Sequence, residues 1–248
     1  MATTIFYDAP DLGHVRVEGP DAADLLQRIT TNNVTTLTIG EGQHSALLDR
    51  KGHVLSLFYL IKQSEERFHL IAPLPIAQKT LGLIQQMIFA DRVTVKDVTA
   101  DFHAFCLLPF PLHYRVVLRS EVDAARADLE KQYRPITQQE FDLLRLKANI
   151  PAYGIDIGED NILLEGNLAH TYARNKGCYP GQEVIERLHT YADGKTPNIV
   201  TAIVLPSSGE TAGRITSRAY DACEGKTYAM VAMRRERTPP ARAPATRS

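Results

Sequence analysis

Apolar and polar positions change their period several times along this chain. Residues 14–18 alternate between apolar and polar side chains, which predicts a strand. Directly after them, Ala22, Leu25, Leu26 and Ile29 recur at helical spacing, which predicts a helix. Strands and helices then follow one another without the regular alternation of a doubly wound sheet. The pattern therefore indicates an α+β fold.

The same two periods predict the remaining elements. Thr137 and Glu140 form a capping box, in which each side chain satisfies a backbone amide of the other residue, so a helix is expected to begin there. The other predicted elements are a hairpin at 45–61, strands at 68–72, 93–98, 103–108 and 114–119, and helices at about 75–89, 122–131, 137–148 and 182–188. After Pro197 the pattern becomes β, with strands at 199–205, 213–217 and 228–233.

This order of elements suggests how the chain is divided. Residues 53–131 read strand, strand, helix, three strands, helix, which would suit a ferredoxin-like sandwich. The β segment after residue 197 is long enough for a small barrel or half-sandwich. Residues 234–248 hold five arginines and three prolines with little to bury, so we expect a solvated tail, or a segment that binds an acidic partner.

Composition excludes several classes of protein. The 248 residues include 28 Lys and Arg against 29 Asp and Glu, so no global charge recruits nucleic acid or an anionic membrane. No apolar stretch approaches the roughly 20 residues of a membrane span, and the first residues do not resemble a signal peptide. Three widely spaced cysteines indicate free thiols in a reducing compartment, so we expect a cytoplasmic protein without a metal site.

The run KGCYPGQE at residues 176–183 carries the most specific chemistry. It places the thiol of Cys178 close to the ammonium of Lys176 and before a Pro-Gly turn into a helix. A nearby cation and a helix N-terminus both favour a thiolate. Cys178 is therefore the candidate functional thiol, with a small buried side chain as the alternative interpretation.

This run resembles the KGCYxGQE signature of the YgfZ-type proteins, which are relatives of the glycine-cleavage T-protein, the aminomethyltransferase family. The resemblance extends to residues 15–34, 46–52, 145–156 and 213–217, and so to nearly the whole chain. It implies a T-protein-like, multi-domain architecture. Residues 1–197 would form the folate-binding region, split around a ferredoxin-like part near 53–135, followed by a short β-barrel-like domain at 198–235 and a flexible tail at 236–248.

The resemblance also implies a function. YgfZ-type proteins act in iron–sulfur cluster biogenesis, so the first hypothesis is a tetrahydrofolate-binding accessory protein that supports cluster assembly or repair in client proteins, with Cys178 as its key thiol. The alternative is a folate-dependent aminomethyl or methyl transferase. A plain binding module with an inert Cys178 is a third hypothesis.

Two departures from the T-protein pattern weaken the expectation of folate-dependent transfer. By the resemblance, Thr80 stands where T-proteins have an aspartate that acts on the folate nitrogen, and a hydroxyl cannot replace a carboxylate as a base. Lys147 stands where they have a glutamate that grips the pterin ring. Glu165, which matches a family glutamate shortly before the cysteine block, is the candidate to serve instead.

The other candidate ligand-binding residues each have a structural alternative. Lys176 could pair with the thiolate or a folate carboxylate, or be a solvated lysine. Tyr179 could stack in a pocket or belong to the core. Asn32 could bind a ligand or cap a loop, and Arg145 lies within an amphipathic helix where an ion pair is the alternative.

Overall fold

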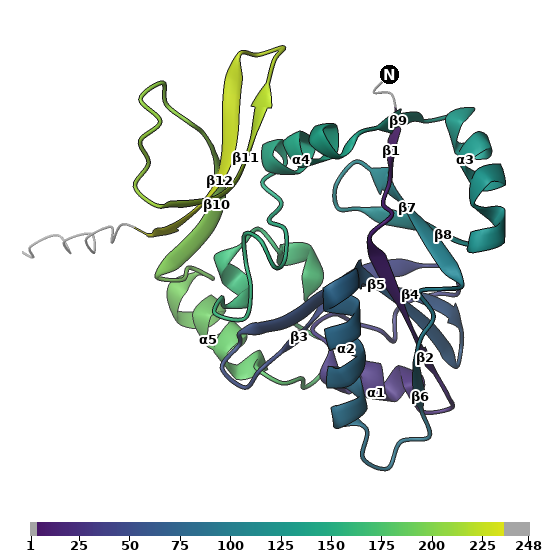
Figure 1. The fold of residues 1–248 in the computed structure, drawn as a ribbon. Helices are drawn as coiled ribbons and strands as arrows, with labels where there is room; N and C mark the ends of the chain where they lie inside the picture. Colours follow the sequence, from purple (N-terminus) through teal and green to yellow (C-terminus); the bar gives the residue numbers. More distant parts are fainter. Residues whose placement is uncertain (1–3, 236–248) are drawn as a thin grey trace, which may run out of the picture.

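The computed structural model describes residues 4–235, which form three β-sheets and five α-helices (Figure 1). The α+β class predicted from the sequence is confirmed. The tail expected at 236–248 lies outside the described residues. One sheet has five strands, one has four and the C-terminal one has three.

The five-stranded sheet has the order β3-β4-β5-β2-β6, and every neighbouring pair is antiparallel. Helix α1 (Ala22–Ile29) buries the four apolar side chains whose spacing predicted it, and α2 (Leu74–Met87) covers the same core. The strands are β2 (Leu12–Glu18), β3 (Gly42–Leu48), β4 (Val54–Ser64), β5 (Arg67–Pro73) and β6 (Thr94–Asp97).

The four-stranded sheet has the order β8-β7-β1-β9, and only the β1–β9 pair is parallel. Helix α3 (Val122–Glu130) packs on one face against Phe6 and Phe105. Helix α4 (Gln138–Lys147) begins at the predicted capping box and contributes side chains to the cluster that contains Cys106. The strands are β1 (Ile5–Asp8), β7 (Phe102–Leu108), β8 (His113–Leu118) and β9 (Arg134–Ile136).

The expected ferredoxin-like sandwich near residues 53–135 is not confirmed. Strands β4, β5 and β6 of this segment belong to the five-stranded sheet, whereas β7 and β8 belong to the four-stranded one. The reason lies at the N-terminus, because β1 and β2 each insert into the interior of a different sheet. The two strands thereby join parts of the chain that are far apart in sequence.

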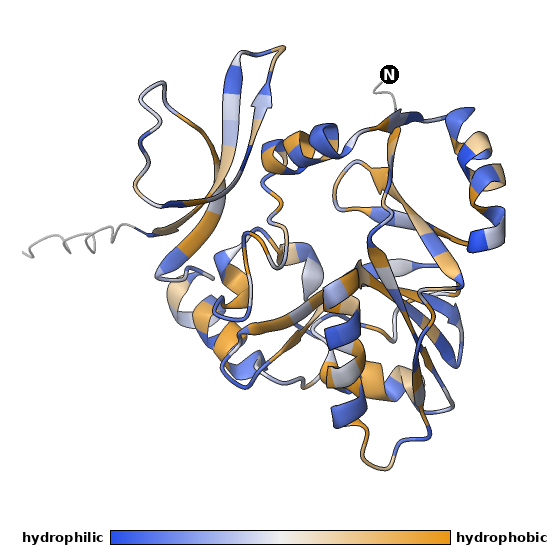
Figure 2. Cartoon of the chain, viewed as in Figure 1, coloured by the Kyte–Doolittle hydropathy of each residue, from blue (hydrophilic) through white to orange (hydrophobic). Residues whose placement is uncertain are grey.

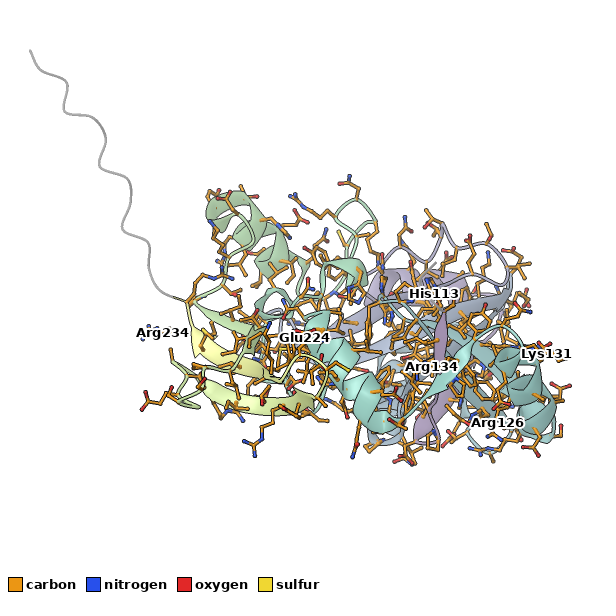
Figure 3. The ribbon with its side chains drawn as sticks, turned by 90° about the horizontal axis from the view of Figure 1, so that it is seen from above. His113, Arg126, Lys131, Arg134, Glu224 and Arg234 are labelled. Atoms are coloured by element: carbon orange, nitrogen blue, oxygen red, sulfur yellow. The ribbon has the colours of Figure 1, made fainter. Side chains whose placement is uncertain are left out.

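The C-terminal β segment is a three-stranded antiparallel sheet rather than a closed barrel within the described residues. Its order is β10-β12-β11, from β10 (Asn198–Val204), β12 (Lys226–Arg234) and β11 (Arg214–Asp221). Figure 1 shows it standing at one end of α4, with which β11 and β12 are in contact. Figure 3 labels Glu224, which lies where this sheet meets the end of α4.

Residues 149–197 connect α4 to this sheet and contain α5 (Gln182–Ala192). Figure 2 shows that α1 and α5 carry apolar and polar residues side by side, as expected for helices with one buried face. The N-cap of α5 is Gly181, whose φ of 80° is in the left-handed region. A Cβ there would lie 2.4 Å from the carbonyl oxygen of Asp49, so only glycine allows this packing.

Candidate functional site

A cavity of about 480 Å³ lies between the two larger sheets, closed by α4 and residues 150–155. Its wall is mainly apolar and contains many aromatic rings, so it suits a flat, largely apolar ligand. Strands β1, β4, β5 and β7 supply parts of the wall from both sheets. The aromatic carbocyclic side chains in the wall are Tyr7, Phe58, Tyr59, Phe110, Tyr114, Phe141 and Tyr153.

One part of the wall is polar but uncharged. The rings of His44 and His170 lie 5.0 Å apart at an interplanar angle of 89°, and those of Tyr59 and Tyr114 lie 4.9 Å apart. Burial, together with the nearby His170, lowers the pKa of His44 to about 4, and burial also lowers the pKa of His170. Both imidazoles are therefore neutral at pH 7. His44 Nε2–H donates to the Leu112 carbonyl at 3.0 Å, which leaves its Nδ1 as an acceptor.

Arg145 is the cavity's cation among the described residues, and its charge is already balanced. Its Nε donates to Asp142 Oδ1 at 2.8 Å, and a terminal nitrogen donates to Asp156 Oδ2 at 2.7 Å. Asp156 also accepts hydrogen bonds from Thr216 and Ser217. The geometry therefore confirms the ion-pair interpretation of Arg145, while a contact between its guanidinium and a ligand stays a prediction.

Thr80 and Lys147, the two departures from the T-protein pattern, both lie outside the cavity wall. Thr80 is fully buried, with its hydroxyl bonded to Ser56 and to the carbonyl of Ile76, and it does not line the cavity. Lys147 turns away as well, because Asp221 and Glu224 bind its ammonium. A more direct observation replaces them: no Asp or Glu of residues 4–235 is part of the cavity wall.

The cysteine block lies apart from the cavity. Cys178 is exposed in the loop that leads into α5, and none of Cys178, Lys176 and Tyr179 lines the cavity. Lys176 is buried, and its ammonium donates to the carbonyl oxygens of Gln27 and Thr30 at the end of α1. Burial lowers the pKa of this amine to about 8. Lys176 is thus a buried helix cap rather than a solvated lysine.

Tyr179 belongs to the core around α5, where Leu48, Val54 and Ile185 also lie. Its ring lies 5.2 Å from the Lys176 ammonium, and its buried hydroxyl has no hydrogen-bond partner among the described residues. Burial raises the pKa of this phenol to about 12. The ring's position fits the core interpretation, and a stacking role toward a ligand stays a prediction.

The two remaining candidates also lie outside the cavity wall. Glu165 is buried and accepts from Asn161 at 2.7 Å and from Asn198 at 3.4 Å, so it ties the loop after α4 to β10. Asn32 is closer to the cavity, because its amide donates to the backbone carbonyls of His44 and His170. It therefore holds two lining residues in place without lining the cavity itself.

The sequence analysis missed the polar wall of the cavity. His44, Tyr59, Tyr114 and His170 are far apart in the chain, and no spacing rule connects them. The structure also has no group of three or more His, Cys, Asp or Glu placed to hold a metal ion within residues 4–235. In the same range no helix is long and apolar enough to cross a membrane.

The sequence of this chain is similar to known proteins over much of its length. Residues 2–108 match the model of the GCVT N-terminal domain. A putative chloroplastic transferase of Arabidopsis thaliana is 22% identical over 230 residues, which cover 75% of this chain and 53% of that protein. An aminomethyltransferase of Bacillus cytotoxicus is 24% identical over 254 residues, which cover 82% of this chain and 68% of the relative. The chain thus spans about half to two thirds of the length of these relatives.

A solved structure shares the fold. The glycine cleavage system aminomethyltransferase T from Bartonella henselae superposes with a TM-score of 0.74 at 18% sequence identity, covering 94% of this chain and 79% of that one. At this identity the likeness shows the fold alone. The comparisons therefore show a GCVT N-terminal domain match over residues 2–108, distant similarity to aminomethyltransferases and a fold shared with one of them.

Proposed function

We propose that this chain binds a tetrahydrofolate-class ligand in the central cavity and acts in the cytoplasm as an accessory protein for iron–sulfur cluster assembly or repair in client proteins, with Cys178 as its functional thiol. The observation that carries the proposal is the wall of the cavity, which has aromatic rings and neutral imidazoles but no carboxylate among the described residues. Such a wall favours binding over group transfer.

The residues present fit a flat heteroaromatic ring. Tyr59 and Tyr114 offer faces for stacking. His44 offers an acceptor, because its N–H donates to Leu112, and His170 offers a donor and an acceptor for the edge of a ring. Folate supplies one-carbon chemistry when it is bound. A base or charge stabiliser of the carboxylate type, which a group transfer would use, is missing from this wall.

The accessory role is supported by the arrangement of the three thiols. Cys106 is buried, whereas Cys178 and Cys223 are exposed at different places in the fold. An iron–sulfur cluster usually needs four cysteine ligands, and the described residues do not bring such a set together. An exposed single thiol suits a transient contact with a client protein better than a resident cluster.

The finer assignments belong to the same proposal. They are the YgfZ-type branch, a folate-binding region at 1–197, a C-terminal β domain at 198–235 and a ligand contact by Arg145, which lines the cavity. Asn32, Glu165, Lys176 and Tyr179 would act on the ligand from outside the cavity wall. Partners are folate and iron–sulfur client or assembly proteins, with neither nucleic acid nor membrane.

The test has two arms. Calorimetric titration with tetrahydrofolate should show saturable binding that Tyr114→Ala weakens, because the substitution removes a stacking face. Deletion of the gene in its host should lower iron–sulfur enzyme activities, which the native chain and Cys223→Ala should restore and Cys178→Ala should not. Full rescue by Cys178→Ala would exclude the thiol role, and absence of binding would exclude the ligand.

The second candidate function is a folate-dependent one-carbon transferase. Aminomethyltransferases among the relatives favour it, and the neutral imidazoles of His44 and His170 in the cavity wall could accept a proton. Formation of methylene- or methyl-tetrahydrofolate above background from a supplied donor, lost in His44→Phe, would establish this function in place of the first.

A further inference from the structure

The loop that carries Cys178 is fastened to helix α1 by a reciprocal pair of contacts. The Lys176 ammonium donates to the backbone carbonyl of Gln27, and the Gln27 side-chain amide donates back to the carbonyl of Lys176. The ammonium also donates to the carbonyl of Thr30, the C-cap of α1. Three hydrogen bonds thus connect two segments about 150 positions apart in sequence.

The same contacts reach the wall of the central cavity. The Gln27 side-chain oxygen accepts from the Val34 amide at 2.7 Å, so the side chain also holds the segment after α1. Within that segment, the Asn32 amide donates to the carbonyls of His44 at 2.9 Å and His170 at 3.1 Å. His44 and His170 line the cavity. The segment 30–34 therefore lies between the cavity wall and the thiol loop and is bonded to both.

The direction of the Lys176 side chain decides between two roles. An ammonium that activated Cys178 would have to face the sulfur, whereas this one is buried and bonded to the carbonyl end of α1, which carries the negative end of the helix dipole. A buried cation bonded to backbone carbonyls holds a loop in one position.

We propose that Lys176 and Gln27 are positioning residues for Cys178, which fasten its loop to the end of α1 and thereby to the wall of the central cavity. The functional consequence of holding the Cys178 loop in this position rests on the proposed function. The fastening itself is a property of the fold and is measurable without folate or a client protein.

Four variants of the full chain separate the roles. Lys176→Met removes the ammonium and keeps the aliphatic stem, Lys176→Arg keeps donors at the same place, and Gln27→Leu removes both side-chain contacts of Gln27. Lys195→Met, at an exposed lysine, is the matched control. Thermal unfolding of each variant shows that it is folded before it is compared.

Hydrogen exchange is the first measurement. In Lys176→Met and Gln27→Leu we expect amide exchange of residues 174–181 to accelerate by about tenfold or more, because local opening becomes easier. Lys176→Arg and Lys195→Met should keep the slow exchange, and residues 221–226 should exchange equally in all variants. Unchanged exchange of 174–181 in both Lys176→Met and Gln27→Leu would overturn the proposal.

Alkylation of Cys178 relative to Cys223, an exposed thiol in the turn after β11, separates positioning from activation. If Lys176 only positions the loop, the ratio of the two rates in Lys176→Met stays equal or rises. A fall of about tenfold, as expected when a thiolate loses its counter-ion, would assign Lys176 to activation and refute positioning. Loss of iron–sulfur rescue in Lys176→Met, regained in Lys176→Arg, would tie the position to the function. Rescue by Cys178→Ala, in contrast, would overturn the function and leave the fastening intact.

Discussion

The buried pair His14 and His69 makes the fold sensitive to acid. His14 Nδ1 lies 2.8 Å from His69 Nε2, both side chains are almost completely buried, and His69 Nδ1 has no partner among the described residues. Burial, with a contribution from His69, lowers the pKa of His14 to about 3, and burial lowers the pKa of His69 to about 4. The positive charges of Arg16 and Arg119 act in the same direction.

The size of the effect follows from these values. An unfolded histidine has a pKa of about 6.5, so the unfolded chain takes up protons first as pH falls. Stability is therefore full above about pH 6.5 and is lost progressively from there toward pH 3, the lower of the two folded-state pKa values. Between pH 7 and pH 5 each of the two histidines lowers the free energy of unfolding by about 2 kcal/mol, so the pair lowers it by about 4 kcal/mol. This value depends mainly on the pKa of histidine in the unfolded chain. Such a loss is large against a total stability of about 5–15 kcal/mol.

The measurement is urea denaturation of the wild-type chain and of His14→Gln/His69→Leu at pH 7 and pH 5. The double variant should lose about 4 kcal/mol less than the wild type over this interval, whatever its stability at pH 7. His113→Gln is the control, because His113 is an exposed histidine. Equal losses in the wild type and the double variant would refute the reasoning, since they would show that the buried pair is not the source.

Three further predictions concern buried polar groups. Thr80→Asp should destabilise the fold by about 3 kcal/mol in urea denaturation, because it places a carboxylate in a fully buried site, and it should leave ligand affinity unchanged, because the residue does not line the cavity. Tyr179→Phe should leave the free energy of unfolding unchanged or raise it by about 1 kcal/mol, because the buried hydroxyl has no hydrogen-bond partner among the described residues. A decrease would show that the hydroxyl does have a partner. Asp156→Ala should cost about 3–5 kcal/mol in the same assay, because Arg145 would keep only one carboxylate partner, and a smaller loss would contradict the buried ion pair.

Most elements were predictable because local rules determine them. The helix at 22–29 and the capping box at 137–140 appear where spacing and hydroxyl–carboxylate pairing place them. Two strands were not predicted, β1 and β9. Strand β9 contains Pro135, which removes a ladder donor and argues against a strand, yet it lies at a sheet edge where that loss is tolerated.

The assignment of strands to sheets could not be predicted from the order of elements. The segment 53–131 has the element order of a compact sandwich, but the tertiary pairings of β1 and β2 divide it between two sheets. Pairings across such distances in sequence depend on which apolar faces meet in the folded chain. The hydrophobic period shows which face of a strand or helix is buried, but it does not show which other element packs against that face.

Only one part of the candidate site could be predicted from the sequence. The motif around Cys178 is contiguous, so it is recognisable in the sequence, and the structure adds that the Lys176 side chain points to α1. The polar wall of the cavity comes from four distant residues, and its character depends on the absence of carboxylates among the described lining residues. Thr80 illustrates the limit, because a residue can match a position in a family pattern while its side chain faces the core.

The separation of cavity and thiol restricts how the two can act together. Cys178 is exposed and does not line the cavity, so a ligand bound there is not in contact with the sulfur in this arrangement of the loop. Two elements connect them: the chain itself, which runs from the lining residue His170 to Cys178, and the segment 30–34, bonded on one side to the backbone of His44 and His170 and on the other to Lys176 and Gln27. If ligand and thiol belong to one function, we expect occupancy of the cavity to act on the loop through these elements. Exchange of residues 174–181 should then respond to tetrahydrofolate in the native chain and lose that response in Asn32→Ala.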